Sequence, residues 1–187
     1  MFEWVSATTR VVQWGLLAGV VAATLATSAT LSVAGVAFPT LLAPVVAASI
    51  AAAAPACLDD PAHGLLAAVP TSARWRTAHR LILVVPACVI AWSVLSPVVD
   101  ASVGWPAASL PPMIALLGTG VATTTVVASW RPDAAAAAGA AAPLTLATAG
   151  VWLPFERIAD ATMIWADHPW PFTVTAATVA VTAAGRR

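Results

Sequence analysis

Residues 11–58 read VVQWGLLAGVVAATLATSATLSVAGVAFPTLLAPVVAASIAAAAPACL and contain no charged side chain. A membrane-spanning helix needs about 20 consecutive apolar residues, so this run is long enough for two of them. We expect one span at residues 11–32 and a second at residues 33–56, joined by a tight external turn near residues 28–32. The run therefore predicts an all-α integral membrane protein.

The composition of the whole chain supports the same fold class. Of its 187 residues, 60% are hydrophobic and 9% are charged, whereas a soluble domain carries about 25% charged residues. So few polar side chains do not cover a water-facing globule of this size, and the solvent of most of the surface must be lipid. The formal net charge of zero argues against nucleic acid as a partner.

Four more apolar segments follow in the remainder of the chain. We expect spans at residues 81–99, 111–130, 134–153 and 170–184. The last is short and needs tilt or local thinning of the bilayer, and the alanine-rich fifth is only weakly hydrophobic. Residues 1–187 thus form a single transmembrane domain with six transmembrane helices.

The arginines set the orientation of these helices. Cytoplasmic loops of membrane proteins are enriched in Lys and Arg, and this chain has no lysine. If the N-terminus is cytoplasmic, the N-terminal segment, the cytoplasmic loops and the C-terminal tail hold seven arginines: Arg10, Arg74, Arg76, Arg80, Arg131, Arg186 and Arg187. Only Arg157 is external. We therefore predict a multi-pass protein of the cytoplasmic (inner) membrane with both termini in the cytoplasm.

Two further segments are expected to lie at the membrane surface. Residues 1–10 combine Phe2 and Trp4 with Glu3 and Arg10, which suits a short interfacial helix in the cytoplasmic headgroup layer. Residues 155–168 mix apolar and acidic side chains. They predict a membrane-associated external segment before the last span.

The segment between the second and third spans carries the most functional information. Asp60 suits an N-cap and Pro61 the first position of a helix, and Pro70 ends it. Within residues 61–69, one apolar face is formed by Ala62, Leu65, Leu66 and Val69. A helix of two turns is unstable alone. Either a protein partner supplies its missing packing or the helix rests on lipid.

This segment resembles the corresponding part of ABC-2-type transporter permeases. The resemblance rests on acidic residues, a Gly-Leu-Leu-Ala-x-x-Pro core at residues 64–70, and Ser72-x-Arg74 before a new span. It implies a cytoplasmic coupling helix at residues 61–69 that docks into a separate ABC ATPase subunit. The implied docking residues are Asp60, Pro61, His63, Leu65, Leu66, Val69, Arg74 and Arg76.

The chain is not expected to be an enzyme. A phosphate-binding P-loop requires its lysine, and the sequence contains none. ATP and Mg²⁺ would therefore bind to the partner subunit, and no cofactor or metal is expected in this chain. Its histidines are not paired within spans, and Cys57 and Cys88 are interpreted as small apolar core residues.

Small residues mark two candidate interfaces. Gly15 and Gly19 form a GxxxG pattern that Ala23 extends, and Gly139 lies in a similarly smooth alanine-rich span. By the resemblance, these two spans would form the interface with a second permease copy or a related permease. The alternative is packing within one subunit. The adjacent Glu156 and Arg157 are candidates for an external gate or for an anchor at the headgroups.

No ionisable residue is expected in the middle of a span, which disfavours a proton-coupled carrier. Threonines of the fourth and sixth spans supply most of the polar atoms, and we expect their hydroxyl groups to bond to their own helices. The resulting hypothesis is a permease subunit of an ATP-driven exporter for a substrate that is amphiphilic, peptide or lipid-like. The alternatives are a substrate-binding membrane subunit of a vitamin-type importer and a non-transporting membrane scaffold.

Overall fold

The structure is a computed structural model that describes residues 14–35, 42–58, 73–103, 110–152 and 168–185. These parts of the chain are helical, with short turns. In chain order the helices are α2 (Trp14–Val33), α3 (Leu42–Leu58), α4 (Ala73–Val103), α5 (Leu110–Val127), the 3-10 turn η3 (Pro132–Ala134), α6 (Ala135–Trp152) and α9 (Pro169–Gly185).

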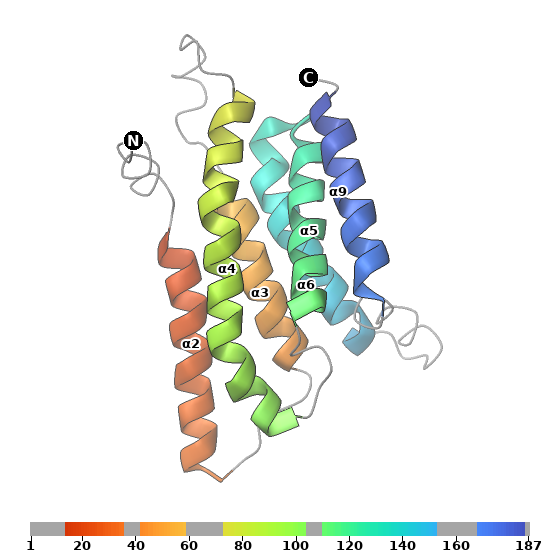
Figure 1. Cartoon of the computed structure of the whole chain (residues 1–187). Helices are drawn as coiled ribbons and strands as arrows, with labels where there is room; N and C mark the ends of the chain where they lie inside the picture. Colours follow the sequence, from red (N-terminus) through yellow and green to blue (C-terminus); the bar gives the residue numbers. More distant parts are fainter. Residues whose placement is uncertain (1–13, 36–41, 59–72, 104–109, 153–167, 186–187) are drawn as a thin grey trace.

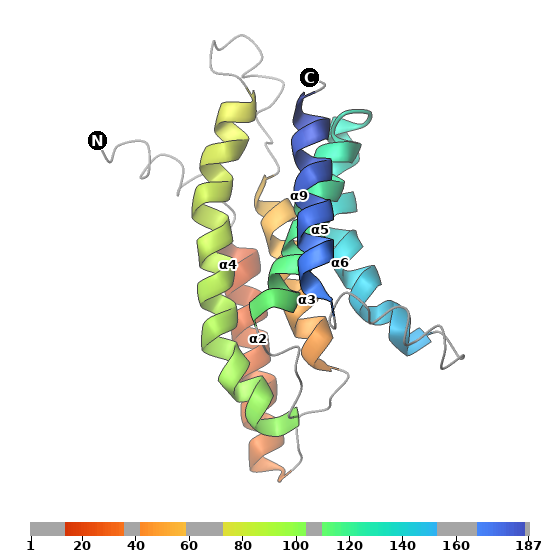
Figure 2. The ribbon, with the colours of Figure 1, turned by 45° about the vertical axis from the view of Figure 1, so that its right-hand side comes forward.

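The α-helices form one bundle in which consecutive helices run in opposite directions (Figure 1). Helix α3 lies in the middle and packs against α2, α4, α5 and α6. Helix α9 packs mainly on α5, on the side of the bundle away from α2 (Figures 1 and 2). Helix α2 contacts only α3 and α4 among the major pairings. The two halves of the bundle therefore meet at α3 and α5.

The composition of α3 explains its central position. Small side chains allow helix backbones to approach closely, which is the main route to tight packing between helices in a membrane. Helix α3 is rich in alanine, and its alanines are buried on every side: Ala43, Ala47, Ala48, Ala51, Ala52, Ala53 and Ala54. Larger residues there would hold the four neighbouring helices apart.

Helix α4 has one buried face and one exposed face. The buried residues recur every three or four positions, as expected for one face of a helix: Arg80, Val84, Cys88, Trp92, Leu95 and Val99. The opposite face exposes apolar side chains, with Ile82 60%, Ile90 63% and Val94 57% exposed. An apolar outer face of this kind suits contact with lipid rather than water.

Three of the described helices are long and apolar enough to cross a membrane: Trp14–Val33, Thr77–Val99 and Leu110–Val127. Segment Ala43–Cys57 is an additional, shorter apolar helix. The chain is accordingly a membrane-embedded helical protein. The expected spans at 134–153 and 170–184 correspond to helices α6 and α9, which run alongside the others in the bundle.

The first turn differs from the sequence-based expectation. The expected turn near residues 28–32 is wrong, because these residues are helical and α2 continues to Val33. The hydroxyl groups of Ser28 and Thr30 donate to the carbonyls of Thr24 and Ala26, respectively, so they bond within the helix instead of breaking it. The helix ends at Val33, and the chain turns away at Gly35, whose φ of 66° lies in the left-handed region that glycine adopts without strain.

Helix α4 also begins well before the apolar segment expected at 81–99. It starts at Ala73 and therefore includes Arg74, Arg76 and Arg80. It runs without a break to Val103 although Pro86 and Pro97 lie inside it. Both prolines are on its less buried, outer side, where a distorted turn meets no neighbouring helix.

Candidate functional site

One end of the bundle collects the basic residues that the structure describes. Helix α2 begins there, α3 ends, α4 begins, the α5–α6 turn lies there and α9 ends (Figure 1). Arg80 lies in the first turns of α4, and Arg131 lies in the α5–α6 turn. We call this the arginine end. The described part of the chain thus brings together residues that the sequence separates by fifty positions.

The two arginines have different surroundings. Arg80 is only 6% exposed, whereas Arg131 is exposed. The register of α4 on α3 explains the burial of Arg80. The thiol of Cys88 lies 3.6 Å from the carbonyl oxygen of Ile50. The two helices are antiparallel, so the arginine end is reached by counting down from Cys88 on α4 and up from Ile50 on α3. Eight residues from this contact, Arg80 is level with Leu58, where α3 ends. A cation is favourable at a helix C-terminus.

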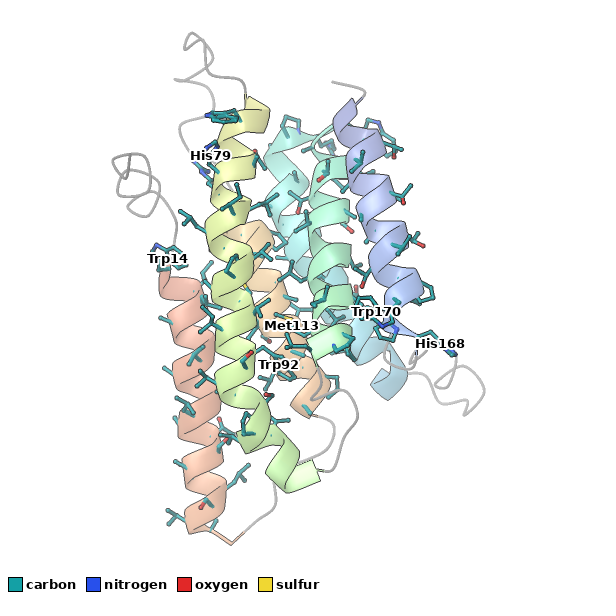
Figure 3. All side chains as sticks on the ribbon, in the orientation of Figure 1. Trp14, His79, Trp92, Met113, His168 and Trp170 are labelled. Atoms are coloured by element: carbon teal, nitrogen blue, oxygen red, sulfur yellow. The ribbon has the colours of Figure 1, made fainter. Side chains whose placement is uncertain are left out.

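An aromatic pair lies beside Arg80 on α4. The rings of Trp75 and His79 are 4.0 Å apart between centroids and inclined at 59°. The Nδ1–H of His79 donates to the main-chain carbonyl oxygen of Trp75 at 2.8 Å, which fixes the imidazole ring against the preceding turn of α4. Trp75 is 61% exposed. Exposed tryptophans near helix ends are typical of a membrane interface; Figure 3 labels two others of the chain, Trp14 and Trp170, near the starts of α2 and α9.

Most residues of the expected ATPase-docking site lie outside the described residues: Asp60, Pro61, His63, Leu65, Leu66 and Val69. The structure describes the two helix ends that flank this segment, Leu58 and Ala73, and both lie at the arginine end. Arg74 and Arg76 are in the first turns of α4. The external gate candidates Glu156 and Arg157 also lie outside the described residues, as do the interfacial residues 1–10.

The small residues expected to form a subunit interface fall into two environments. Gly15, Gly19 and Ala23 are exposed on α2. A Cβ atom added to either glycine would meet nothing within 4 Å. Gly139 is instead buried inside the bundle. For Gly139 the geometry supports the alternative of packing within one subunit.

Gly139 lies at a close crossing of three helices. A Cβ atom on Gly139 would lie 2.8 Å from the carbonyl oxygen of Gly120 in α5 and 2.9 Å from Cβ of Pro55 in α3, and it would also overlap the hydroxyl of Thr124. In return, a Cβ atom on Gly120 would lie 3.0 Å from the carbonyl oxygen of Gly139. Only glycine fits at position 139 without a shift of backbone. We call Pro55, Gly120 and Gly139 the three-helix crossing.

A second proline, Pro143 of α6, also affects this crossing. Pro143 lies one turn after Gly139 in α6 and has no N–H group, so the usual helical hydrogen bond to the Gly139 carbonyl does not form. That carbonyl faces Gly120 of the neighbouring helix. Contacts between a Cα–H group and a carbonyl oxygen are common where helices cross closely.

The hydroxyl groups bond to their own helices, as expected. In α5, Thr119, Thr123, Thr124 and Thr125 donate to the carbonyls four residues earlier at 2.7–2.9 Å. In α9, Thr173, Thr175 and Thr178 do the same at 2.7–2.9 Å. The prediction of back-bonding is confirmed for these residues. Their hydroxyl protons are therefore engaged within their own helices.

Trp92 is the polar side chain that sequence reasoning passed over. It is 0% exposed, and among the residues that the structure describes no acceptor pairs with its indole Nε1–H. Buried polar groups are nearly always hydrogen-bonded, so this exception needs an explanation. The sequence did give a signal, because Trp92 lies inside a span rather than at its end, where tryptophans usually occur.

The cysteines behave as expected, since Cys57 and Cys88 are both buried and form no disulfide bond with each other. Within the described residues, no group of three or more His, Cys, Asp or Glu side chains is arranged to hold a metal ion.

The features above define a class of protein: a helical, membrane-embedded bundle in which the arginines that the structure describes lie at one end. Comparison of the chain with protein-family models, with curated proteins and with solved structures finds no match in any of the three.

Proposed function

We propose that the chain is the transmembrane permease subunit of an ATP-driven ABC-2-type exporter, with ATP hydrolysed on a separate subunit. The observation that carries the proposal is the position of the connection between α3 and α4. Its two flanking helix ends, Leu58 and Ala73, lie at the arginine end of the bundle. Its sequence, residues 59–72, holds the segment that resembles a coupling helix.

The packing around this connection supports a mechanical role. Helix α3 enters the connection one turn after Pro55, and Pro55 touches α5 and α6 through Gly120 and Gly139. Helix α4 follows the connection, and Arg80 in its first turns is buried. A displacement of the connection would therefore act on α3, α4, α5 and α6 together. This is what an ATP-driven permease requires of its docking segment.

In the proposal, six helices span the membrane, with both termini and the arginine end in the cytoplasm; the antiparallel order of the described helices supports this. Exposed apolar residues occur on several helices, including Val33, Ile90, Val174 and Val181. Helix α2 is little buried by the rest of the chain, since only 11% of the residues in its apolar stretch are buried. In the proposal, its face with Gly15, Gly19 and Ala23 packs against a second permease subunit.

A substrate-binding subunit of a vitamin-type importer is the second candidate function. Such a subunit needs a polar cavity for its ligand, and the hydroxyls of α5 and α9 that would supply much of it bond to their own helices. The substrate of an exporter built from apolar and alanine-rich helices would be amphiphilic, peptide or lipid-like.

The docking of an ATPase is tested with Leu65→Asp and Leu66→Asp, which place a charge on the apolar face of residues 61–69. We expect the wild-type chain, purified from its native membrane, to retain a P-loop protein with ATPase activity. Each variant should lose that protein while its level in the membrane stays unchanged.

The matched control is Ala67→Asp, which adds the same charge on the opposite side of the expected helix. It should retain the ATPase. If Leu65→Asp co-purifies with the ATPase as well as the wild type does, the docking segment is not where we propose. If the wild type retains no ATPase, the exporter proposal fails.

A further inference from the structure

The strongest unexplained feature of the bundle is the indole N–H of Trp92. The side chain is fully buried, and Nε1 has no hydrogen-bond partner among the described residues. Leaving such a donor unsatisfied in the folded state costs about 1–3 kcal/mol. Phenylalanine would avoid this cost while giving up only part of the packing volume. The presence of tryptophan therefore points to an acceptor that reaches Nε1 when something binds.

The position of Trp92 fixes the depth of the candidate site. Cys88 is at the middle of the apolar segment Thr77–Val99, and Trp92 follows four residues later, which is about 6 Å along the helix axis. Trp92 therefore lies well within the apolar part of the bundle, on the side away from the arginine end. Figure 3 labels Trp92 and Met113, which belong to the same buried cluster, and Met113 lies in the first turn of α5.

The neighbouring side chains make this site apolar and adaptable. Trp92 and Met113 belong to the same buried cluster as Cys88, Leu95 and Leu116. Methionine is flexible and polarisable, so it adjusts to the shape of a partner more readily than branched side chains do. Helix α4 packs more extensively on α3 than on α5. A molecule that enters between α4 and α5 would disturb the less extensive of these two contacts.

The charge of the surroundings defines the chemistry of the ligand. Helix α4 carries no charged residue between Arg80 and Asp100, and the sequences of α2, α3 and α5 carry none at all. An anionic acceptor would thus be buried without a counter-ion, which is far more costly than burying a neutral group. A carbonyl or ether oxygen on an apolar body satisfies the indole N–H without this cost.

We propose that Trp92 and Met113 form a binding site inside the bundle for a neutral, largely apolar molecule, whose single carbonyl or ether oxygen accepts a hydrogen bond from the Trp92 indole. The site does not depend on the proposed export function, because its binding is a property of this chain alone. If the chain is an exporter, a neutral, largely apolar molecule with one acceptor oxygen is also a substrate that the bundle could bind.

The test uses the purified full-length chain in detergent micelles, with ¹⁵N-labelled indole groups and ¹³C-labelled methionine methyl groups. Trp92→Phe and Met113→Leu identify the two signals. Three probes of similar length are compared: methyl decanoate, which has a neutral carbonyl; dodecane, which has no acceptor; and decanoate, which is charged. Methyl decanoate should move the Trp92 indole proton downfield and shift the Met113 methyl signal. Dodecane should leave the indole proton in place.

Binding to Trp92→Phe is followed through the Met113 methyl signal. Loss of one hydrogen bond should weaken the affinity for methyl decanoate about five- to tenfold, whereas the affinity for dodecane should not change. Trp170→Phe, at an exposed indole on α9, is the matched control and should bind like the wild type. Retention of the other eight indole signals checks that Trp92→Phe folds.

Four results would overturn the proposal. The first is that no probe moves either signal, and the second is that dodecane and methyl decanoate shift the indole proton equally. The third is that decanoate binds more tightly than its methyl ester. The fourth is that the Trp92 indole proton exchanges with a bound water in the protein without a probe. If Trp92→Phe does not fold, the comparison of the three probes on the wild-type chain still decides between these outcomes.

Discussion

The carbonyl oxygen of Gly120 lies 2.8 Å from the position that a Cβ atom on Gly139 would occupy. The two glycines belong to α5 and α6, and Pro55 of α3 closes the same contact from a third side. A single missing methyl group at position 139 thus sets the distance between three helices.

Gly139→Ala should lower the free energy of unfolding by about 1–3 kcal/mol, because the added methyl group meets backbone and a proline ring that cannot move independently. The measurement is an SDS titration of the purified protein in mixed micelles. Gly19→Ala is the control, since nothing lies within 4 Å of its added Cβ. That variant should match or exceed the wild type, by up to about 1 kcal/mol. Equal losses in both variants would contradict the crossing.

Trp92→Phe should leave the free energy of unfolding within about 1 kcal/mol of the wild-type value, because the lost packing volume is offset by removal of an unpaired buried donor. Trp92→Ala should instead cost about 3–5 kcal/mol, since it opens a cavity in the core. The same SDS titration measures both. A large loss in Trp92→Phe would mean that the indole N–H is already hydrogen-bonded in the unliganded protein.

Arg80→Met should destabilise the protein by about 2 kcal/mol, because it removes a buried cation level with the C-terminus of α3 while keeping most of the side-chain length. Arg131→Met changes an exposed arginine at the same end and should be within about 0.5 kcal/mol of the wild type. Thermal unfolding in detergent, followed by helical circular dichroism, distinguishes them. Similar effects would show that burial of Arg80 contributes nothing.

Thr123→Val should change the free energy of unfolding by less than about 1 kcal/mol, because the hydroxyl bonds to the carbonyl of Thr119 in the same helix and valine has the same shape. Thr178→Val, which loses the bond to Val174 on the exposed helix α9, is the companion variant. A much larger loss in Thr123→Val alone would indicate that its hydroxyl bonds to a different helix.

Ser32→Cys and Arg131→Cys test the proposed orientation, because both positions are exposed and lie at opposite ends of the bundle. A membrane-impermeant maleimide added to intact cells should label the cysteine at position 32. It should label the one at position 131 only after the membrane is permeabilised. The native cysteines are buried, so the wild-type chain is the unlabelled control. Labelling of position 131 in intact cells would reverse the orientation.

The sequence by itself determined the membrane environment and the existence of the helices. Long uncharged segments must bury their backbone hydrogen bonds in helices when the solvent is lipid. The sequence also predicted the local bonding of the threonines, since this bonding needs only the carbonyl one turn away in the same helix. It misplaced the first turn because Ser28 bonds within α2 in the same way.

Only the tertiary structure decided which small residues bring helices together. Gly15, Gly19 and Gly139 have similar sequence contexts, but only Gly139 meets a carbonyl and a proline from other helices. Likewise, the burial of Arg80 and the unpaired indole of Trp92 depend on the register of α4 against α3. Sequence periodicity defines a face of a helix, whereas the neighbour of that face is set by packing between distant segments.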